Sequence, residues 1–282
     1  MVPALSDKKP SHDLGEGWVG WWGKFLTFAK TLRSEHLKAL RKLLENILGF
    51  KGYLRFVSKT YLIMVGAGLM QKKYPELFFL KKIIRPGFTC IDIGANLGYY
   101  STFLSKLAGS NGKVLAVEPI PLFQEIWKDN VKASGVDNLE LLPYALGGEN
   151  SVIQMGTPER NGLLHHGMTK VVSSAEEKYA HFYDVAMKVP DELFAGLERL
   201  DFVKCDVEGF EFQVFSNMQA TLAKHKPLIQ TELNGDKNRD NVIGLLEKLG
   251  YRVHVLSAEN ELKPCAGPEI ASHHGDFYFK SV

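Results

Sequence analysis

The segment CIDIGANLGYYS, residues 90–101, has the clearest chemical content of the sequence. Its apolar start predicts a strand that ends at Asp92 and Ile93, Gly94 permits a tight turn, and Gly98 allows the next helix to approach closely. Glu118 stands twenty residues beyond Gly98, at the end of the next predicted strand. A carboxylate at that position can accept hydrogen bonds from both hydroxyls of a ribose. The spacing therefore indicates a cofactor that contains adenosine.

The charge of this loop distinguishes between adenosine cofactors. A pyrophosphate is bound by Gly-x-Gly-x-x-Gly, or by a lysine followed by serine or threonine, at a helix N-terminus. Here the spacing is Gly94-x-x-x-Gly98, the loop contains no lysine or arginine, and Asp92 would repel a phosphate. S-adenosylmethionine has no phosphate and carries a sulfonium and an ammonium group, which suit an acidic loop. We therefore expect S-adenosylmethionine; a nicotinamide-dependent oxidoreductase is the alternative that this loop disfavours.

A second group of carboxylates lies in and after LDFVKCDVEGFE, residues 200–211. Asp206 ends a buried strand at the sheet edge where a transferable methyl group would sit, Glu208 lies just beyond it, and Glu232 ends the following strand. Carboxylates so close repel each other, which raises the pKa of one of them unless a cation intervenes. A hydroxyl acceptor needs a base or a metal ion to remove its proton. We take these three as candidate catalytic residues, with Asp206 also next to the cofactor.

Two other interpretations of the three carboxylates remain open. Together they could bind Mg²⁺ or Mn²⁺ through oxygen, because hard ions favour carboxylates, although we do not favour a metal. Acids at a helix N-terminus are also stabilising without any catalytic role. Lys204 faces the same side of its strand as Asp206, so we expect it to pair with a carboxylate.

Two histidine pairs are further candidates for a general base. His165 and His166 lie in the long excursion between the third and fourth predicted strands, and His273 and His274 precede the last one. If the last strand runs antiparallel, its start lies at the active-site edge. Surface histidines are common, so the pairs also have an interpretation without catalysis.

The elements around these motifs alternate between strand and helix, which predicts an α/β fold with a parallel sheet covered on both faces. In such sheets, ligands bind at the carboxyl ends of the strands. The predicted helices between the first strands are residues 99–107 and 122–133. The predicted strands are residues 88–93, 113–118, 139–142, 202–206, 228–233, 251–256 and 277–280.

Composition limits the class of protein. The chain has 282 residues, 45% of them hydrophobic and 23% charged, as in ordinary globular proteins. A net charge of +2 is too small to indicate nucleic-acid binding. Three cysteines, two of them in apolar runs, favour a reducing compartment, and we expect a cytoplasmic protein. The longest apolar run, residues 61–70, has about half the ~20 residues that a membrane span requires, so we expect no transmembrane segment.

The N-terminal part differs from the rest. We expect residues 1–70 to form a tail and a helical extension, and residues 71–282 to form the catalytic domain. Residues 1–16 are polar and predict a poorly ordered tail. Apolar residues with helical spacing follow, interleaved with lysine and arginine. We expect these helices to pack on the main domain; a membrane-surface helix and a homodimer contact are the alternatives.

Taken together, DIGANLGYYS, VEP, LPYALG, KCDVEGFE and PLIQTEL resemble the FkbM family of S-adenosylmethionine-dependent methyltransferases. The resemblance covers roughly residues 75–282, and the pairing of the first motif with Asp-Val-Glu-Gly-x-Glu is its most specific part. It implies a Rossmann-like class I methyltransferase fold with a mostly parallel seven-stranded sheet, the last strand antiparallel, and O-methylation of sugars or secondary metabolites. Val189-Pro190-Asp191 departs from the family's Leu-Asp-Asp-like stretch, which leaves the shape of residues 147–200 open.

The resemblance also implies roles for matching residues. Glu118 would hold the ribose, and the backbone near Ala145 would hold the adenine. The residues that would hold the methionine part are Asp92, Gly94, Ala95, Asn96 and Gly98.

We therefore predict an S-adenosylmethionine-dependent O-methyltransferase acting on a hydroxyl of a glycan or small metabolite. The alternatives are the oxidoreductase and a non-catalytic binding module that keeps the fold. The signatures of a Walker loop, a Gly-x-Ser-x-Gly elbow and a His-Glu-x-x-His zinc site do not occur in the sequence.

Overall fold

The structure is a computed structural model that describes residues 16–160, 163–172 and 178–282. Its contacts divide the chain into two units, one that ends at Tyr53 and one that spans Leu54–Val282. All the candidate site residues belong to the second unit. The tail predicted over residues 1–16 lies, except for its last residue, outside the described residues.

Helix α1 (Glu16–Gly66) consists of two helical segments that meet at a kink at Gly49, which agrees with the helical spacing that the sequence shows here. Its only non-helical residue is Gly49, with φ 65° and ψ 165°, a backbone conformation that glycine adopts without a Cβ clash. The side chains of its tryptophans and of Phe25 and Phe28 lie outside the described side chains. Among the described residues, no helix is both long and apolar enough to span a membrane.

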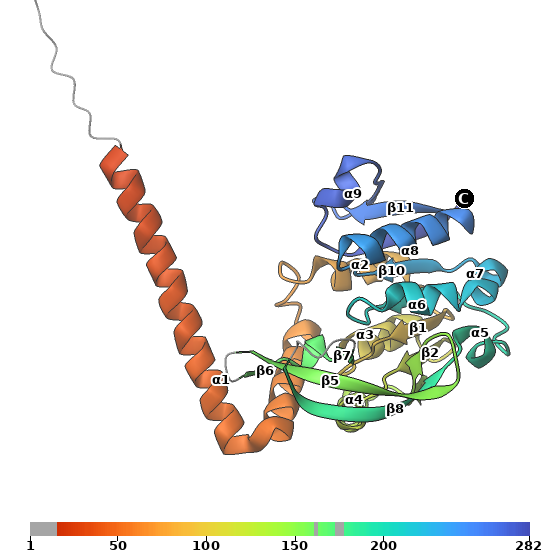
Figure 1. Ribbon diagram of the computed structural model, residues 1–282, viewed down its shortest axis with the longest axis horizontal. Coiled ribbons are helices and arrows are strands. Elements are labelled where there is room, and N and C mark those ends of the chain that lie inside the picture. The colour runs from red at the N-terminus through yellow and green to blue at the C-terminus, as the bar shows by residue number, and fades with distance from the viewer. Residues whose placement is uncertain (1–15, 161–162, 173–177) are drawn as a thin grey trace, which may run out of the picture. The chain divides into compact units, whose positions relative to one another are not determined.

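The second unit is built on an eight-stranded sheet with the order β12-β11-β13-β10-β9-β1-β2-β3 (Figure 1). The strands from β10 to β3 are parallel to their neighbours, whereas β13 is antiparallel to both β10 and β11. The bounds are β1 (Thr89–Ile93), β2 (Lys113–Val117), β3 (Leu139–Leu142), β9 (Phe202–Cys205), β10 (Leu228–Thr231), β11 (Tyr251–Leu256), β12 (Leu262–Pro264) and β13 (Phe277–Ser281).

This sheet confirms the α/β fold of class I methyltransferases that the sequence predicts. All seven predicted strands are present, and the last one is antiparallel as expected. The difference is β12, a three-residue edge strand that pairs with β11 in a hairpin and brings the total to eight. Loops that follow β1, β2, β9 and β10 meet at one edge because these strands run in the same direction.

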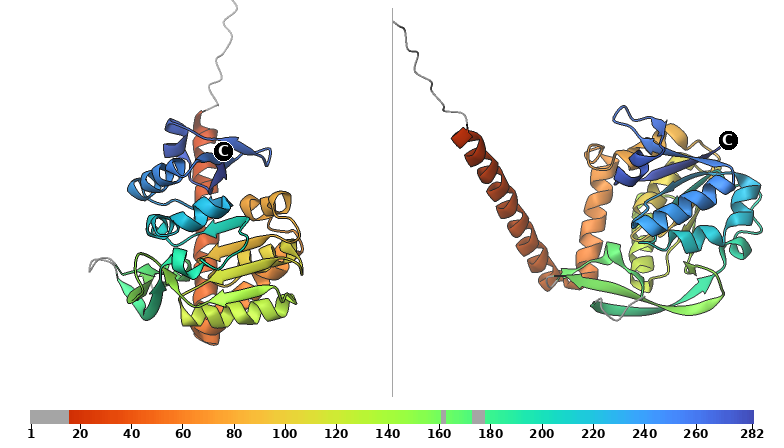
Figure 2. Two further views of the ribbon diagram at one scale, coloured as in Figure 1. Left: turned by 90° about the vertical axis from the view of Figure 1, so that its right-hand side faces the viewer. Right: turned by 45° about the horizontal axis from the view of Figure 1, so that its top comes forward.

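Helices cover both faces of the sheet (Figure 2). Ile91 packs on one face with side chains of α6, α7 and α8, and Cys90 packs on the other face with side chains of α2 and α3, because neighbouring residues of a strand point to opposite faces. The bounds are α2 (Pro75–Ile83), α3 (Tyr99–Ala108), α4 (Pro121–Ser134), α5 (Pro190–Leu193), α6 (Glu211–Ser216), α7 (Gln219–His225), α8 (Asp236–Lys248) and α9 (Pro268–Ser272).

The excursion between β3 and β9 forms a second, five-stranded sheet, a shape that the sequence leaves open. Its long strands β5 and β8 are antiparallel, and they pair from Ser151 with Met187 to Pro158 with Tyr179. The bounds are β4 (Ala145–Leu146), β5 (Ser151–Arg160), β6 (Leu163–Leu164), the 3₁₀ turn η1 (His166–Met168), β7 (Lys170–Val171) and β8 (Tyr179–Lys188). Residues of β5, η1 and β7 line the site that the carboxyl edge of the main sheet forms.

Candidate active site

The loop after β1 folds back onto the end of β2. Gly94 has φ 80°, and the backbone N–H groups of Gly94 and Ala95 both donate to the carbonyl oxygen of Val117 at 3.0 Å. Gly98 has φ 88° and packs so closely on Trp127 that a β-carbon there would lie 2.8 Å from the indole ring. Glycine is therefore required at both predicted positions by conformation and by space.

Asp92 is buried at the end of β1 and is held by a short chain of hydrogen bonds. The Ser101 hydroxyl donates to Asp92 Oδ2 at 2.5 Å, and Trp127 Nε1 donates to Ser101 Oγ at 3.0 Å. Burial raises the pKa of Asp92 to about 6, although the Ser101 hydrogen bond opposes the shift. The carboxylate is therefore fixed in direction and costly to keep charged without a nearby cation.

Glu118 follows β2 and joins two loops. One carboxylate oxygen accepts a hydrogen bond from the backbone N–H of Asn96, and the other accepts one from Ile120, both at 2.8 Å. The side chain is 4% exposed, and burial raises its pKa to about 7. Each carboxylate oxygen has a second lone pair, so both can still accept a hydroxyl hydrogen.

Three cavities meet at Gly94, which lines all of them. One is apolar, and its walls include Pro119, Tyr144, Ala145, Leu146 and Phe210. Another surrounds Glu118, and its walls include Asn96, Phe123, His166, Thr169 and Glu208.

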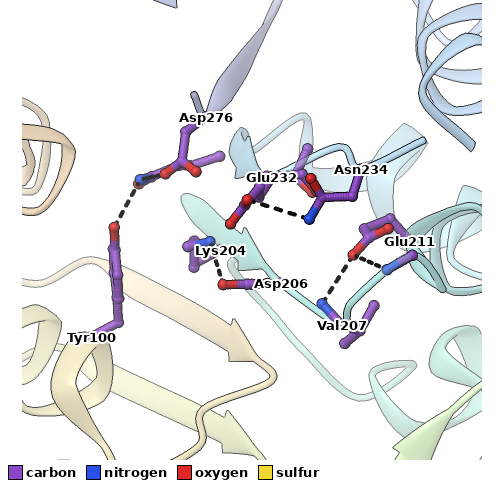
Figure 3. A network of polar contacts seen from close by, with 11 residues as sticks. Tyr100, Lys204, Asp206, Val207, Glu211, Glu232, Asn234 and Asp276 are labelled. Carbon is purple, nitrogen blue, oxygen red and sulfur yellow. Dashed lines mark hydrogen bonds and ion pairs between the residues drawn. The ribbon is translucent and has the colours of Figure 1, made fainter. Parts of the chain in front are cut away.

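The remaining cavity of these three, here called the acceptor cavity, has a volume of about 460 Å³. Its carboxylates and aromatic rings come from several distant parts of the chain, from the end of α1 to the segment before β13. The carboxylates are Glu76, Asp92, Asp206, Glu232 and Asp276, and the rings are Tyr61, Tyr74, Tyr99 and Tyr100. Figure 3 shows Asp206, Glu232 and Asp276 in one polar network with Lys204 and Tyr100.

Lys204 is the cation of this network. Its Nζ lies 3.5 Å from Asp206 Oδ2, which confirms the predicted pairing with a carboxylate, and 5.1 Å from the centroid of the Tyr100 ring. Burial acts to lower the pKa of Lys204, but the carboxylates of Asp276 and Asp206 outweigh it, so that the pKa is raised. Lys204 therefore stays protonated and reduces the repulsion among the carboxylates around it.

Lys204 also belongs to a row of buried polar side chains that crosses four neighbouring strands. Asp92 of β1 pairs in register with Lys204 of β9, which pairs with Gln230 of β10, which pairs with Tyr278 of β13. Partners in register point to the same face, and all four are at most 3% exposed. Gln230 Nε2 donates to the Tyr100 hydroxyl at 3.3 Å and to Asp276. The row connects Asp92, at the end of β1, to the far side of the acceptor cavity.

The turn after β9 is held by Glu211. Its carboxylate accepts hydrogen bonds from the backbone N–H groups of Val207 and Gly209, at 3.0 and 3.2 Å, and from Asn238. Within this turn Glu208 has a positive φ of 54°. Burial, together with repulsion by Asp206, raises the pKa of Glu208 to about 7.

The three candidate catalytic carboxylates are divided between two cavities. Asp206 and Glu232 line the acceptor cavity, whereas Glu208 lines the cavity around Glu118, to which Asp206 also contributes. Burial, followed by the charges of Asp206 and Asp276, raises the pKa of Glu232. Among the described residues, no group of three histidine, cysteine, aspartate or glutamate side chains is arranged to hold a metal ion.

The histidine pairs are placed differently from each other. His166 lines both the acceptor cavity and the cavity around Glu118. His273 bonds through Nε2 to the backbone oxygen of Asp276 at 3.1 Å, and His274 is exposed. Because β13 is antiparallel, its start does reach the site, but the side chain that lies there in the acceptor cavity is Asp276.

Sequence reasoning missed Glu76, Asp276 and the tyrosines of the acceptor cavity. Glu76 resembles an ordinary acid in the first turn of a helix, and Asp276 precedes a strand without any motif. The one available signal was Gln230, a polar residue in the middle of the apolar strand LIQT.

The residues around Gly94 fit S-adenosylmethionine. Asn96 Oδ1 is buried without a hydrogen-bond partner among the described residues, so it can accept a hydrogen from a ligand. The apolar cavity beside Ala145 suits an adenine ring, Glu118 suits a ribose, and the Asp92 carboxylate suits a cationic end. Among the described residues, no lysine or arginine lines the cavity around Glu118, and the lack of a cation disfavours a pyrophosphate there.

Curated relatives match short stretches of the chain. A protein-L-isoaspartate O-methyltransferase of Methanococcoides burtonii is 28% identical over 91 residues, which are 32% of this chain and 39% of that protein. A second such protein, from Archaeoglobus fulgidus, is 32% identical over 59 residues, 21% of this chain and 27% of that one. The chain thus spans less than half the length of these relatives.

Solved structures that are similar include a methyltransferase FkbM from Methylobacillus flagellatus, with 13% identity and a TM-score of 0.42 over 70% of this chain and 48% of that one. A precorrin-6y C5,15-methyltransferase from Geobacter metallireducens has 16% identity and a TM-score of 0.43 over 73% and 85% of the two chains.

The family comparison covers the site itself. The methyltransferase FkbM domain matches residues 92–253, more than half of the chain. This range begins at Asp92 and includes Glu118, the turn after β9 and Glu232. The chain therefore belongs to the methyltransferase FkbM family.

Proposed function

We propose that this protein is an S-adenosylmethionine-dependent O-methyltransferase that acts on a hydroxyl of a glycan or small metabolite. The observation that carries this proposal is that Gly94 lines all three cavities, so that the adenosine side of the site opens onto the acceptor cavity. A methyl donor bound along the loop after β1 would therefore face an acceptor beside Asp206 and Glu232.

Residues of the site would contact the cofactor along its whole length. The wall near Ala145 would cover the adenine, the Glu118 carboxylate would accept hydrogen bonds from the ribose, and Asn96 and Asp92 would bind the amino-acid end. Bound S-adenosylmethionine supplies an electrophilic methyl group, which forms a carbon–oxygen bond with the acceptor as its carbon–sulfur bond breaks. We assign Glu208, which lies on the ribose side, to cofactor contacts.

The acceptor side supplies a base. A hydroxyl must lose its proton to become a good nucleophile, and a carboxylate whose pKa is raised takes up that proton more readily than an ordinary one. Glu232 has such a raised pKa and lines the acceptor cavity. We assign Glu232 as the general base and Asp206 as the group that orients the acceptor. Lys204 Nζ lies 3.5 Å from Asp206 Oδ2 and holds that carboxylate in place.

Two measurements test the proposal. Calorimetric titration should show binding of S-adenosylhomocysteine and no binding of NAD, because the latter carries a pyrophosphate. Incubation of the protein and methyl-labelled S-adenosylmethionine with cell extract should then give a labelled product that contains a methyl ether. Binding of NAD alone would favour the oxidoreductase, and cofactor binding without any transfer would favour a non-catalytic module.

A further inference from the structure

A further cavity of about 370 Å³ adjoins the acceptor cavity and is here called the second cavity. Its walls come from the start of α2, the turn between β11 and β12, and the segment before β13. Glu76 and Asp276 line both cavities, so the two meet at this pair of carboxylates. Neither Gly94 nor Glu118 contributes to the second cavity, which therefore lies outside the cofactor site.

Tyr278 and Asn260, which both line the second cavity, carry buried polar atoms without a partner. The Tyr278 hydroxyl and Asn260 Oδ1 have no hydrogen-bond partner among the described residues, and Tyr278 is 0% exposed. Buried polar atoms in folded proteins are almost always paired. These two atoms therefore indicate hydrogen bonds that a ligand completes.

The walls of the second cavity are held in place before any ligand arrives. Lys82 Nζ donates to the backbone oxygen of Asn260 at 2.8 Å and thereby ties α2 to the turn after β11. The Tyr278 ring packs edge-on against Phe79, with 5.6 Å between the ring centroids. His273 bonds to the backbone of Asp276. Binding of a ligand to a preformed cavity costs less conformational entropy than binding to a cavity whose walls must first become ordered.

The lining also defines the chemical class of the ligand. Ser257, Asn260 and Tyr278 offer neutral hydrogen-bonding groups, and Pro75 and Leu256 offer carbon surfaces. A sugar ring has the same mixture, with hydroxyl groups on its rim and C–H groups on its faces. A phosphate or a carboxylate would be repelled by the two shared carboxylates. Each cavity is within the range of roughly 300–1,000 Å³ that small-ligand sites occupy.

We propose that the second cavity binds a second sugar ring of the acceptor, so that the substrate is an uncharged saccharide of at least two rings. The reacting ring would lie in the acceptor cavity beside Glu232, and the next ring would contact Tyr278 and Asn260 beyond the shared carboxylates. This inference rests on the proposed function and specifies its substrate class.

The first test measures the size of the product. The full-length protein is incubated with methyl-tritiated S-adenosylmethionine and a deproteinised extract of the organism. The labelled product is then separated by size, and its mass is measured by mass spectrometry. A labelled, uncharged product with two or more rings supports the inference. A single-ring or anionic product overturns it and leaves the proposed function standing. No labelled product, despite binding of S-adenosylhomocysteine, refutes the proposed function and this inference with it.

The second test uses the purified acceptor and two variants. Tyr278→Phe removes only the hydroxyl, and Asn260→Gly removes the side chain while tolerating the positive φ of 60°. Each should raise KM for the acceptor about twofold to tenfold, the range for one neutral hydrogen bond. The value of kcat and the affinity for S-adenosylhomocysteine should not change.

Tyr251→Phe is the matched control. Its hydroxyl is also buried in the same sheet, but it donates to the backbone oxygen of Leu222 at 3.3 Å and lines neither cavity. This variant should lower Tm and leave KM unchanged, whereas Tyr278→Phe should raise KM without lowering Tm. If Tyr278→Phe lowers Tm and leaves KM unchanged, the hydroxyl is structural and the inference is wrong.

Discussion

A β-carbon on Gly94 would lie 1.9 Å from the carbonyl oxygen of Asp206. The loops after β1 and β9 therefore touch at a point where only glycine fits, and both loops line the candidate site. We predict that Gly94→Ala moves them apart and abolishes binding of S-adenosylhomocysteine, measured by calorimetry on protein whose circular dichroism shows an intact fold.

Gly135 provides the control for backbone strain alone. It has a similar positive φ of 65° at the end of α4, but a β-carbon there would meet nothing within 4 Å. Gly135→Ala should cost about 1–2 kcal/mol of stability and leave the affinity for S-adenosylhomocysteine unchanged. If Gly94→Ala binds as well as this control does, the close approach has no part in forming the site.

Removal of the Glu118 carboxylate should weaken cofactor binding. Hydrogen bonds to a charged group are worth about 1.5–3 kcal/mol, so Glu118→Ala should raise the dissociation constant of S-adenosylhomocysteine roughly 10- to 100-fold. Glu140→Gln is the comparison, because Glu140 is exposed on β3 and forms an ion pair with Lys113. Equal affinities for the two variants would remove Glu118 from the ribose site.

Cofactor affinity should depend on pH. Burial raises the pKa of Asp92 to about 6 and that of Glu118 to about 7, and the ligand prefers both carboxylates ionised. Affinity should therefore rise between pH 5.5 and pH 7.5 and level off above, with protons released on binding at the lower pH. Calorimetry in two buffers of different ionisation enthalpy measures that release, and a flat profile would contradict the assignment.

The same raised pKa values have the opposite effect on the protein without ligand. In the folded state these acids hold their protons to a higher pH than in the unfolded state, so the native state binds more protons. The free energy of unfolding should then fall as the pH rises from about 4 through 7. Denaturation by urea at several pH values, with and without S-adenosylhomocysteine, separates the two effects.

Substitution of the proposed base should affect turnover and not cofactor binding. General base catalysis contributes about 10²- to 10⁴-fold, so Glu232→Gln should lower kcat by that factor and leave the affinity for S-adenosylhomocysteine unchanged. Glu247→Gln, on the exposed side of α8, should have no effect. EDTA should not change the rate; loss of activity in EDTA with recovery in Mg²⁺ or Mn²⁺ would instead establish a metal-dependent reaction.

The exposed apolar face of the N-terminal helix should need to pack against another surface. Leu40, Leu43 and Ile47 are 51%, 54% and 68% exposed and have the spacing of one helix face. We predict that this face packs on the catalytic domain, so that deletion of residues 1–50 lowers Tm or weakens acceptor binding. Co-sedimentation with anionic vesicles is the decisive comparison: strong, salt-sensitive binding by the full chain alone would favour a lipid surface instead.

The part of the site that follows single strands could be predicted from the sequence. The apolar runs before Asp92 and Asp206 are bounded by glycine turns, so both strand ends and the cofactor loop follow from local patterns. The acceptor cavity could not be predicted in this way. Glu76 and Asp276 are two hundred residues apart and meet only because β13 is antiparallel and begins beside α2.

The second sheet was unpredictable for a different reason. Strands β4, β6 and β7 have two residues each, which is too short for any alternation of polar and apolar residues to appear. Their positions depend on pairing with β5 and β8, so that Met155 and Val171 reach the apolar cavity through long-range contacts.

The buried row of Asp92, Lys204, Gln230 and Tyr278 has a consequence for folding. Side chains alternate between the two faces of a strand, so a one-residue slip of any of these strands would move its polar member into the apolar packing on the opposite face. The slipped sheet would bury a charge or an amide without its partners, and it would also lose the wall of the acceptor cavity. The strands therefore reach their correct register and form the site at the same step of folding. A compact chain folded in the wrong register would be unstable as well as inactive.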